Sequence, residues 1–175
     1  MFGRWLQPAT ALPQPEGAEQ LEFTVRTALP GADEETVRVV TAIAGLLGTV
    51  AYADREFAPA EQARAREELA RIDGISPAGI DAVCAALVKH VREIATVQAP
   101  RYSRVLCELA DHDLRLQVLD ILVGLAAADR TITLAETNVL RLLATSLGLT
   151  QEDYNAAQSK FVELLAVLHG PPQGR

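Results

Sequence analysis

The feature that most constrains the fold is an acidic segment that the chain contains twice. The first copy reads AYADREFAPAE (51–61) and the second reads AAADRTITLAE (126–136). In both copies Ala-Asp-Arg follows an apolar run, and a glutamate stands seven residues after the aspartate. A repeated unit of this size cannot bury its own apolar faces, so the duplication predicts two similar halves that pack on each other.

The apolar residues around the two segments recur with helical spacing. Residues 34–53 are apolar on so much of the helix circumference that this helix belongs in the middle of a bundle. The segment 113–128 has the same relation to the second acidic segment, which predicts that the two central helices lie side by side. Other helices are expected at 19–28, from Pro59, from Pro77 to about Ile94, after Pro100, from Thr133 and after Thr150.

The predicted fold class is therefore all-α, a compact bundle of seven to eight helices built from two pseudo-repeated three-helix units. We assign residues 1–30 to an N-terminal arm with a short helix, 31–170 to the helical domain and 171–175 to a C-terminal tail. The first repeat covers about 34–96 and the second about 113–168. We expect the arm to be a loosely held tail, and the alternative is that its Phe2, Trp5 and Leu6 dock on the domain or on a partner.

Two local patterns predict how the first half packs. Gly45 and Gly48 lie inside the first central helix, where they would let a neighbouring helix approach closely. In the next helix, Arg64 with Glu68 and Glu67 with Arg71 are i,i+4 pairs of opposite charge. Such pairs are typical of a solvated face, so we expect this helix to expose them.

Composition excludes some partners. The formal net charge is −7 and the pI is about 5.0, whereas a nucleic-acid-binding surface needs a surplus of Lys and Arg. The longest stretch without charge, 39–53, is shorter than the roughly 20 residues that cross a bilayer. We therefore expect no nucleic-acid partner and no transmembrane segment.

The cysteines and the N-terminal residues indicate the compartment. Cys84 and Cys107 form neither a disulfide framework nor a CxxC pair, which favours a reducing compartment. The N-terminal segment MFGRWLQPATALPQPEG lacks the continuous apolar region of a secretory signal peptide. The expected localisation is cytoplasmic.

Four carboxylates are the candidate metal ligands, namely Asp54, Glu61, Asp129 and Glu136. The segments are not EF-hands, because an EF-hand loop places its bidentate glutamate at position 12. The alternative is structural: in Thr133-x-x-Glu136 each side chain can bond the other residue's backbone amide, as in a capping box. An aspartate at a helix C-terminus opposes the helix dipole, so each of the two aspartates needs a compensating group. The candidates are loop amides, the N-terminus of the following helix, the adjacent arginine or a cation.

The remaining candidates have structural interpretations. Cys84 lies on an apolar stripe and reads as a buried thiol, and His90, six residues later, faces another side of that helix. The cluster Asp111-His112-Asp113 offers metal ligands or a pH-sensitive group, but a helix start also explains it. We find no P-loop, HExxH, GxSxG or dinucleotide-binding motif.

Each acidic segment is followed by a Leu-Gly-Leu-Ser/Thr-like turn, which pairs Gly74 with Gly148 and Ser76 with Thr150. With these turns the two segments resemble the tellurite-resistance TerB family. The resemblance covers about 37–162 and is strongest in DLRLQVLDILVGLAAADRTITLAETNVLRLLATSLGLT (113–150). It implies an all-helical cytoplasmic bacterial domain, also found in J-domain co-chaperones, that is linked to tellurite and stress responses and has no established enzymatic activity. It also implies divalent metal binding at Asp54, Glu61, Asp129 and Glu136.

This sequence departs from the family pattern directly after each aspartate. The family usually has glycine there, whereas this chain has Arg55 and Arg130. Glycine adopts the left-handed conformation at little steric cost. Each arginine must therefore either adopt that conformation at a higher steric cost or form a different turn. An arginine beside each carboxylate also supplies a cation in the place of a metal.

Two functions from different classes follow. The first is a non-catalytic, acidic, TerB-like interaction or adaptor module with an unidentified protein partner and weak divalent-cation binding at its two loops. In this interpretation there is no catalytic residue and no firmly assigned cofactor. The alternative is a metal-dependent enzyme that uses Asp54, Glu61, Asp129 and Glu136.

Overall fold

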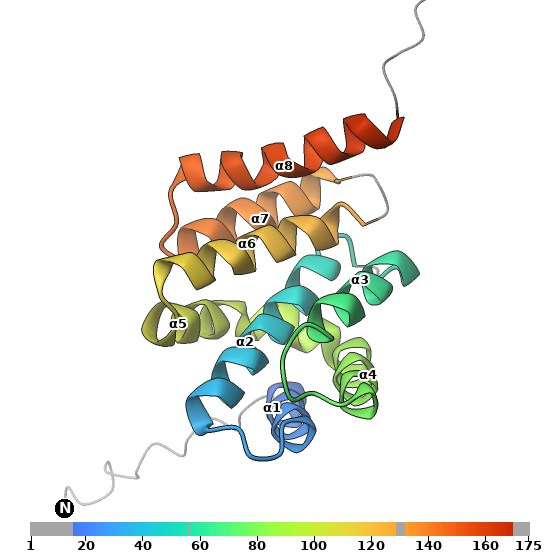
Figure 1. Ribbon diagram of the computed structural model, residues 1–175, viewed down its shortest axis with the longest axis vertical. Helices are drawn as coiled ribbons and strands as arrows, with labels where there is room; N and C mark the ends of the chain where they lie inside the picture. Colours follow the sequence, from blue (N-terminus) through green and yellow to red (C-terminus); the bar gives the residue numbers. More distant parts are fainter. Residues whose placement is uncertain (1–15, 56, 129–131, 170–175) are drawn as a thin grey trace, which may run out of the picture.

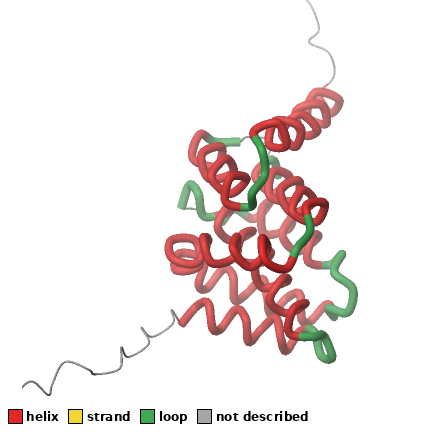
Figure 2. The backbone as a smooth tube through the Cα atoms, turned by 90° about the vertical axis from the view of Figure 1, so that its left-hand side faces the viewer, coloured by secondary structure: helices red, strands yellow, loops and turns green. Residues whose placement is uncertain are grey.

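A computed structural model describes the backbone of residues 16–55, 57–128 and 132–169. Within these ranges it describes side chains from residue 17 to residue 161. Within these ranges the chain forms a compact helical bundle without strands, which confirms the predicted all-α class (Figures 1 and 2). The elements are α1 (Glu16–Ala28), α2 (Glu34–Ala51), α3 (Pro59–Leu69), α4 (Pro77–Glu93), the π-helical segment η1 (Ile94–Gln98), α5 (Ala99–Leu109), α6 (His112–Ala126), α7 (Leu134–Ser146) and α8 (Gln151–His169). In the part of the chain so described, no helix is both long and apolar enough to span a bilayer.

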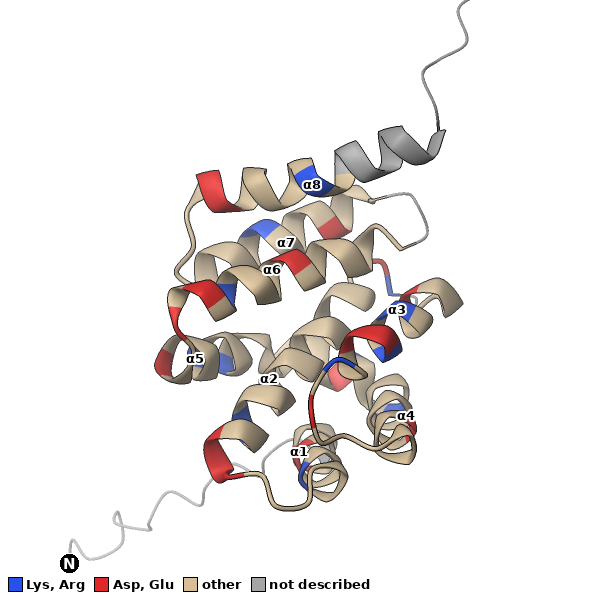
Figure 3. Cartoon of the chain, in the orientation of Figure 1, with Lys and Arg blue, Asp and Glu red and all other residues tan. Residues whose placement is uncertain are grey.

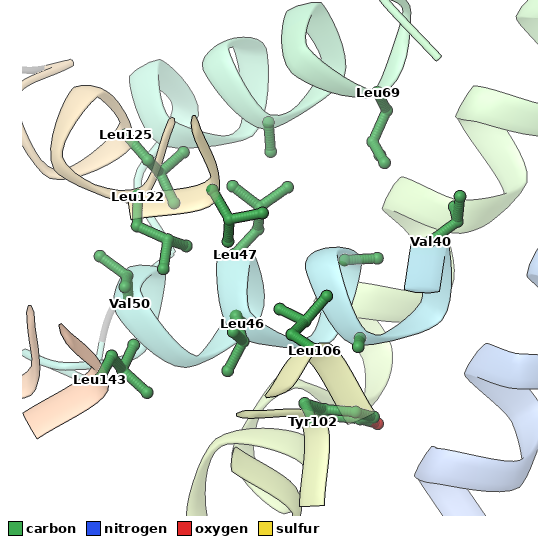
Figure 4. Close-up of a cluster of buried hydrophobic side chains, with 14 of the residues drawn as sticks. Val40, Leu46, Leu47, Val50, Leu69, Tyr102, Leu106, Leu122, Leu125 and Leu143 are labelled. Carbon is green, nitrogen blue, oxygen red and sulfur yellow. The ribbon is translucent and has the colours of Figure 1, made fainter. Parts of the chain in front are cut away.

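Helix α2 forms the centre of the bundle. It contacts α1, α3, α4, α5, α6 and α7, and every residue from Ala44 to Ala51 is buried. Figure 4 shows its Leu46, Leu47 and Val50 among leucines that α5, α6 and α7 contribute. The prediction of a helix buried on most of its circumference is confirmed, and α6 packs against α2 as expected.

Gly45 is the point where α5 crosses α2. A Cβ atom built on Gly45 would lie 2.2 Å from Cε2 of Tyr102, far inside van der Waals contact. The Tyr102 ring is 5% exposed, and burial raises the pKa of its hydroxyl to about 12. The expected close approach at Gly45 is confirmed. A Cβ atom built on Gly48 would have more room, with Cδ2 of Leu87 as its nearest neighbour at 3.3 Å.

The helix starts follow from side chains that accept backbone N–H groups. Asp33 accepts from Thr36 at 2.7 Å, Ser76 from Gly79 at 3.1 Å, and Asp111 from Leu114 at 2.8 Å. These bonds satisfy amides that the first helical turn leaves without partners. The bond from the Thr36 amide also lowers the pKa of Asp33, because it stabilises the ionised carboxylate.

The two halves share local geometry at the described positions. Gly74 and Gly148, which the sequence pairs, both have positive φ, at 91° and 69°. The hydroxyls of Ser76 and Thr150 each accept the backbone N–H of the residue three positions later, at 3.1 Å in both halves. Whether the halves superpose as three-helix units stays a prediction.

The N-terminal part joins the bundle through α1. This helix packs along α4 and places Leu21 and Val25 fully inside the core. Phe2, Trp5 and Leu6 lie outside the described residues.

The sequence predicts that Pro100 breaks the helix that begins at Pro77, but the helical path continues through Pro100. The α-helical pattern of α4 stops at Glu93, passes through η1, and resumes in α5 with proline in the first turn. Proline lacks an N–H and clashes with the carbonyl four residues earlier. The wider π-helical turn before Pro100 accommodates this defect without a loop.

Candidate functional site

The end of α2 presents a strained, exposed turn. The helix ends at Ala51, so Asp54 lies in the turn beyond it and not in the last helical turn that the sequence suggested. Asp54 and Arg55 are both exposed. Arg55 has φ of 72° and is, among the described residues, the one non-glycine residue with positive φ. The arginine therefore does take the left-handed conformation that glycine would take more cheaply.

Glu61 occupies the third position of α3 and is only 6% exposed. Its Oε2 accepts the backbone N–H of Ala58 at 2.8 Å. Ala58 has no side-chain acceptor to return the bond, so this start forms half of a capping box. The Glu61 carboxylate therefore stabilises the start of α3.

Glu136 has the same position in α7 and is 5% exposed. Its Oε2 accepts the Thr133 N–H at 2.6 Å, while the Thr133 hydroxyl accepts the Glu136 N–H at 3.2 Å. The complete capping box predicted from Thr133-x-x-Glu136 is therefore present. Both glutamates of the duplicated segments accept the backbone N–H of their N-cap residue, and the bond is returned only at the start of α7.

The four candidate metal ligands are only partly placed. Asp54, Glu61 and Glu136 have the positions given above, and Asp129 lies outside the described residues. Within the described ranges, no group of three or more His, Cys, Asp or Glu side chains is arranged to hold a metal ion. In Figure 1 the C-terminal ends of α2 and α6, which lead into the two acidic segments, lie on the same side of the molecule. Metal binding stays a prediction.

A buried carboxylate that the sequence analysis missed lies on α3. Glu68 is 4% exposed, and its two oxygens contact Arg64 Nη2 at 2.6 Å and Arg71 Nη1 at 2.9 Å. The prediction that this helix exposes its charged pairs is therefore wrong for Glu68. Arg71 was expected to pair with Glu67, but it pairs with Glu68. The helical spacing of the sequence could have indicated this burial, because Glu68 shares one helix face with Ala65 and Leu69. All three residues are buried.

The cysteines and His90 show no arrangement for nucleophilic catalysis. Cys84 and Cys107 are free, and Cys84 is half-buried. Burial raises the pKa of the Cys84 thiol, although nearby Arg66 opposes the shift, so the reactive thiolate is disfavoured. His90 packs instead against Gly17 of α1. These positions agree with a structural role for Cys84.

The Asp111-His112-Asp113 cluster is a helix start. Asp111 is the N-cap of α6, and the ring nitrogens of His112 lie 3.9 Å from a carboxylate oxygen of Asp113 and 4.0 Å from one of Asp153. His112 is exposed, so water screens these contacts. The structural interpretation of the cluster is sufficient.

The two caps predict opposite effects of two small substitutions. Thr133→Ala removes one bond of the complete box and should lower the free energy of unfolding by about 1 kcal/mol. Ala58→Ser adds the acceptor that the α3 start lacks and should raise it by about 0.5–1 kcal/mol, because Ala58 already has the extended conformation of an N-cap. Urea unfolding followed by circular dichroism measures both, with Asn138→Ala on the exposed face of α7 as the control. Equal losses for Thr133→Ala and Asn138→Ala would contradict the capping role.

Comparison with known proteins identifies one family. A family model described as tellurite resistance protein TerB matches residues 40–159, which is well over half of the chain. The matched range begins in α2 and ends in α8, so it contains both acidic segments. Neither a curated protein nor a solved structure matches the chain.

Proposed function

This chain belongs to the TerB family of tellurite resistance proteins, and from that premise we propose that it is a non-catalytic interaction module, an adaptor in a stress-response assembly. Its partner is a protein that binds the turn after α2. The observation that carries the proposal is the conformation of Arg55, because a long charged side chain is held exposed at a backbone position suited to glycine.

The strained backbone conformation of Arg55 is better explained by a functional role than by the fold. A non-glycine residue in the left-handed region costs about 1–2 kcal/mol, and such residues are concentrated at functional sites. Asp54 and Arg55 together present both charges on one exposed turn. Elsewhere Lys and Arg are scattered among Asp and Glu over the helices (Figure 3), which favours a protein surface over a nucleic acid as the partner.

The use of the loop glutamates supports a module over an enzyme. A metal-dependent enzyme would need Glu61 and Glu136 to turn toward a shared ion, whereas each is nearly buried with one oxygen on its own cap amide. Releasing a glutamate would leave an amide without its partner, at a cost of about 1 kcal/mol or more. Their positions therefore favour structural roles.

The substitution Arg55→Gly separates binding from folding. It relieves the left-handed strain, so the free energy of unfolding should stay unchanged or rise by up to about 1 kcal/mol. At the same time it removes the side chain that we propose contacts the partner. We expect affinity purification from the native host to recover a partner with the wild type and with the surface control Arg92→Ala, but not with Arg55→Gly.

The result must be repeated with the purified partner, because recovery from a lysate does not by itself locate the binding surface. A dissociation constant at least tenfold weaker for Arg55→Gly than for Arg92→Ala would support the proposal. Equal affinities of the wild type and Arg55→Gly would contradict it.

We also propose weak divalent-cation binding at the two acidic segments, with Asp54 and Asp129 as the protein carboxylates. The glutamates contribute less, because each has one oxygen on a cap amide. Since Ca²⁺ needs six to eight oxygens, backbone carbonyls and water would have to complete the site, and its affinity would be low.

Calorimetry with Ca²⁺, Mg²⁺ and Mn²⁺ tests the cation site. We expect binding by the wild type and by Glu136→Gln, and none by Asp54→Asn combined with Asp129→Asn. Binding that survives the double substitution, or that Glu136→Gln removes, would contradict the assignment to the aspartates.

The family and the cysteines support a cytoplasmic role in resistance to tellurite or another stress. The two cysteines are free, and one is exposed, which favours the reducing cytoplasm. A host that lacks the gene should be more sensitive to tellurite or to another stress, and the wild-type gene should restore growth while the Arg55→Gly gene should not.

A further inference from the structure

A second candidate site lies where the two predicted repeats meet, away from the acidic turn. A cavity of about 470 Å³ opens between the middle of α2, the end of α3 and the first half of α6. These three helices pack pairwise against one another (Figure 1). The volume falls in the range of about 300–1,000 Å³ that is typical of small-molecule sites.

The walls of the cavity are mostly aliphatic. Six of its ten lining residues are Ile or Leu, namely Ile43, Leu47, Leu69, Ile72, Leu114 and Ile121. Four of these six are only partly buried, so apolar surface still faces the cavity. An apolar body would cover that surface, which is the main driving force for binding in such a pocket.

The charged side chains at the cavity already have partners. Glu68, which is 4% exposed, contacts Arg64 at 2.6 Å and Arg71 at 2.9 Å. Asp120 contacts Lys160 of α8 at 2.5 Å. A charged ligand of either sign would exchange one ion pair for another and would also lose part of its hydration. A charged head group therefore gains no affinity at this cavity.

The remaining polar residue of the wall is uncharged. Gln117 is exposed and lies on α6 between Leu114 and Ile121, about one helical turn from each. Its side-chain amide can both donate and accept a hydrogen bond, and this matches a hydroxyl group, which also does both. Because an exposed hydrogen bond competes with water, this contact orients a ligand more than it strengthens binding.

We propose that this cavity binds a small uncharged amphiphile of the alcohol class, with its aliphatic body between α2, α3 and α6 and its hydroxyl group at Gln117. The ligand class follows from the aliphatic wall and from the mutual pairing of the charged side chains. The site involves neither Asp54 nor Arg55, so its test is independent of the proposed interaction module.

Three probes that differ only in head group test the ligand class, namely n-octanol, n-octylammonium and n-octanoate. Each is titrated below its aggregation concentration into the ¹⁵N-labelled protein, and amide shifts are followed by NMR. We expect the largest shifts around the cavity, and a dissociation constant for n-octanol roughly three- to tenfold below those of both ions. A tenfold rise in salt concentration should change the n-octanol constant by less than about twofold, because no charge contributes to its binding.

The length of the aliphatic chain tests the driving force. n-Hexanol has two methylene groups fewer than n-octanol and should bind roughly tenfold more weakly, because each methylene adds apolar area that the cavity buries. Equal affinities of the two alcohols would contradict binding through the aliphatic wall.

Two variants locate the body and the head group. Ile121→Trp should fill the cavity and abolish binding of n-octanol, whereas Leu142→Trp, which adds the same side chain on the exposed face of α7, should preserve it. Gln117→Glu places a carboxylate without a partner at an exposed position, so it tests the head group even where Ile121→Trp fails to fold. It should tighten n-octylammonium binding by about threefold and weaken n-octanoate binding.

Four results would each overturn the proposal. These are tighter binding of either ion than of n-octanol to the wild type, n-octanol shifts that do not saturate or lie away from the cavity, equal n-octanol affinities of folded Ile121→Trp and Leu142→Trp, and unchanged affinities for both ions in Gln117→Glu.

Discussion

Gly45→Ala should lower the free energy of unfolding by about 2–3 kcal/mol. The new Cβ would lie 2.2–2.7 Å from three atoms of the Tyr102 ring, and that ring is enclosed in the core, so either α5 or the ring must move. The gain of about 1 kcal/mol in helix propensity over glycine does not offset this overpacking. Urea unfolding followed by circular dichroism measures the change.

Gly48→Ala is the matched control, one turn further along the same helix. Its new Cβ would meet the tip of Leu87 at 3.3 Å, and a leucine side chain can shift by a few tenths of an ångström. We therefore expect stability within about 0.5 kcal/mol of the wild type, or a gain of up to about 1 kcal/mol from helix propensity. A loss at Gly48 as large as at Gly45 would show that backbone flexibility, and not the contact with Tyr102, requires the glycines.

The second large effect is expected at the buried carboxylate of α3, and it is asymmetric. Arg64→Leu leaves Glu68, which is 4% exposed, with Arg71 as its remaining cation. We expect a loss of about 2–3 kcal/mol, because a buried charge that loses a partner is expensive. Glu68→Gln should cost about 1 kcal/mol, since Arg64 and Arg71 have side chains 29% and 66% exposed and can be solvated.

A double-mutant cycle measures the coupling in this network. Glu68→Leu introduced into the Arg64→Leu background removes the buried charge and should recover most of the lost stability. Additive losses in the double variant would contradict the assignment, because they would mean that Arg64 stabilises the fold through its packing near Gly124 and not through Glu68.

What the sequence could predict was local. The starts of the helices were predictable because the signals are the capping residues themselves, such as Asp33, Ser76 and Thr133. The capping role of Glu136 was predictable for the same reason. The fold class followed from helical periodicity over long segments, which depends on no distant contact.

What the sequence could not predict depends on contacts between distant segments. Gly45 indicated that some neighbour comes close, but its partner Tyr102 is on another helix. Arg64 and Glu68 have the spacing of an exposed pair, and only the packing of α3 against α6 shows that Glu68 is enclosed. For Arg55 the sequence left two alternatives open, the left-handed conformation or a different turn. Only the structure shows that the residue takes the left-handed conformation.

The sequence identified the residues of the candidate site better than it identified their roles. The duplicated segments indicated four carboxylates as candidate ligands. In the structure two of these, Glu61 and Glu136, cap the starts of helices. The residue that now carries the functional proposal is Arg55, which the sequence marked only as a departure from the family pattern. A departure that costs energy and stays exposed is better explained by a partner than by the fold.

Hydrogen exchange on the complex tests this account most directly. Exchange is measured by mass spectrometry for the protein alone and with the partner recovered by affinity purification. We expect protection on binding to be greatest in peptides that contain Asp54 and Arg55, and to be absent from the same peptides of the Arg55→Gly variant. Protection confined to other helices, with exchange at Asp54 and Arg55 unchanged, would contradict it.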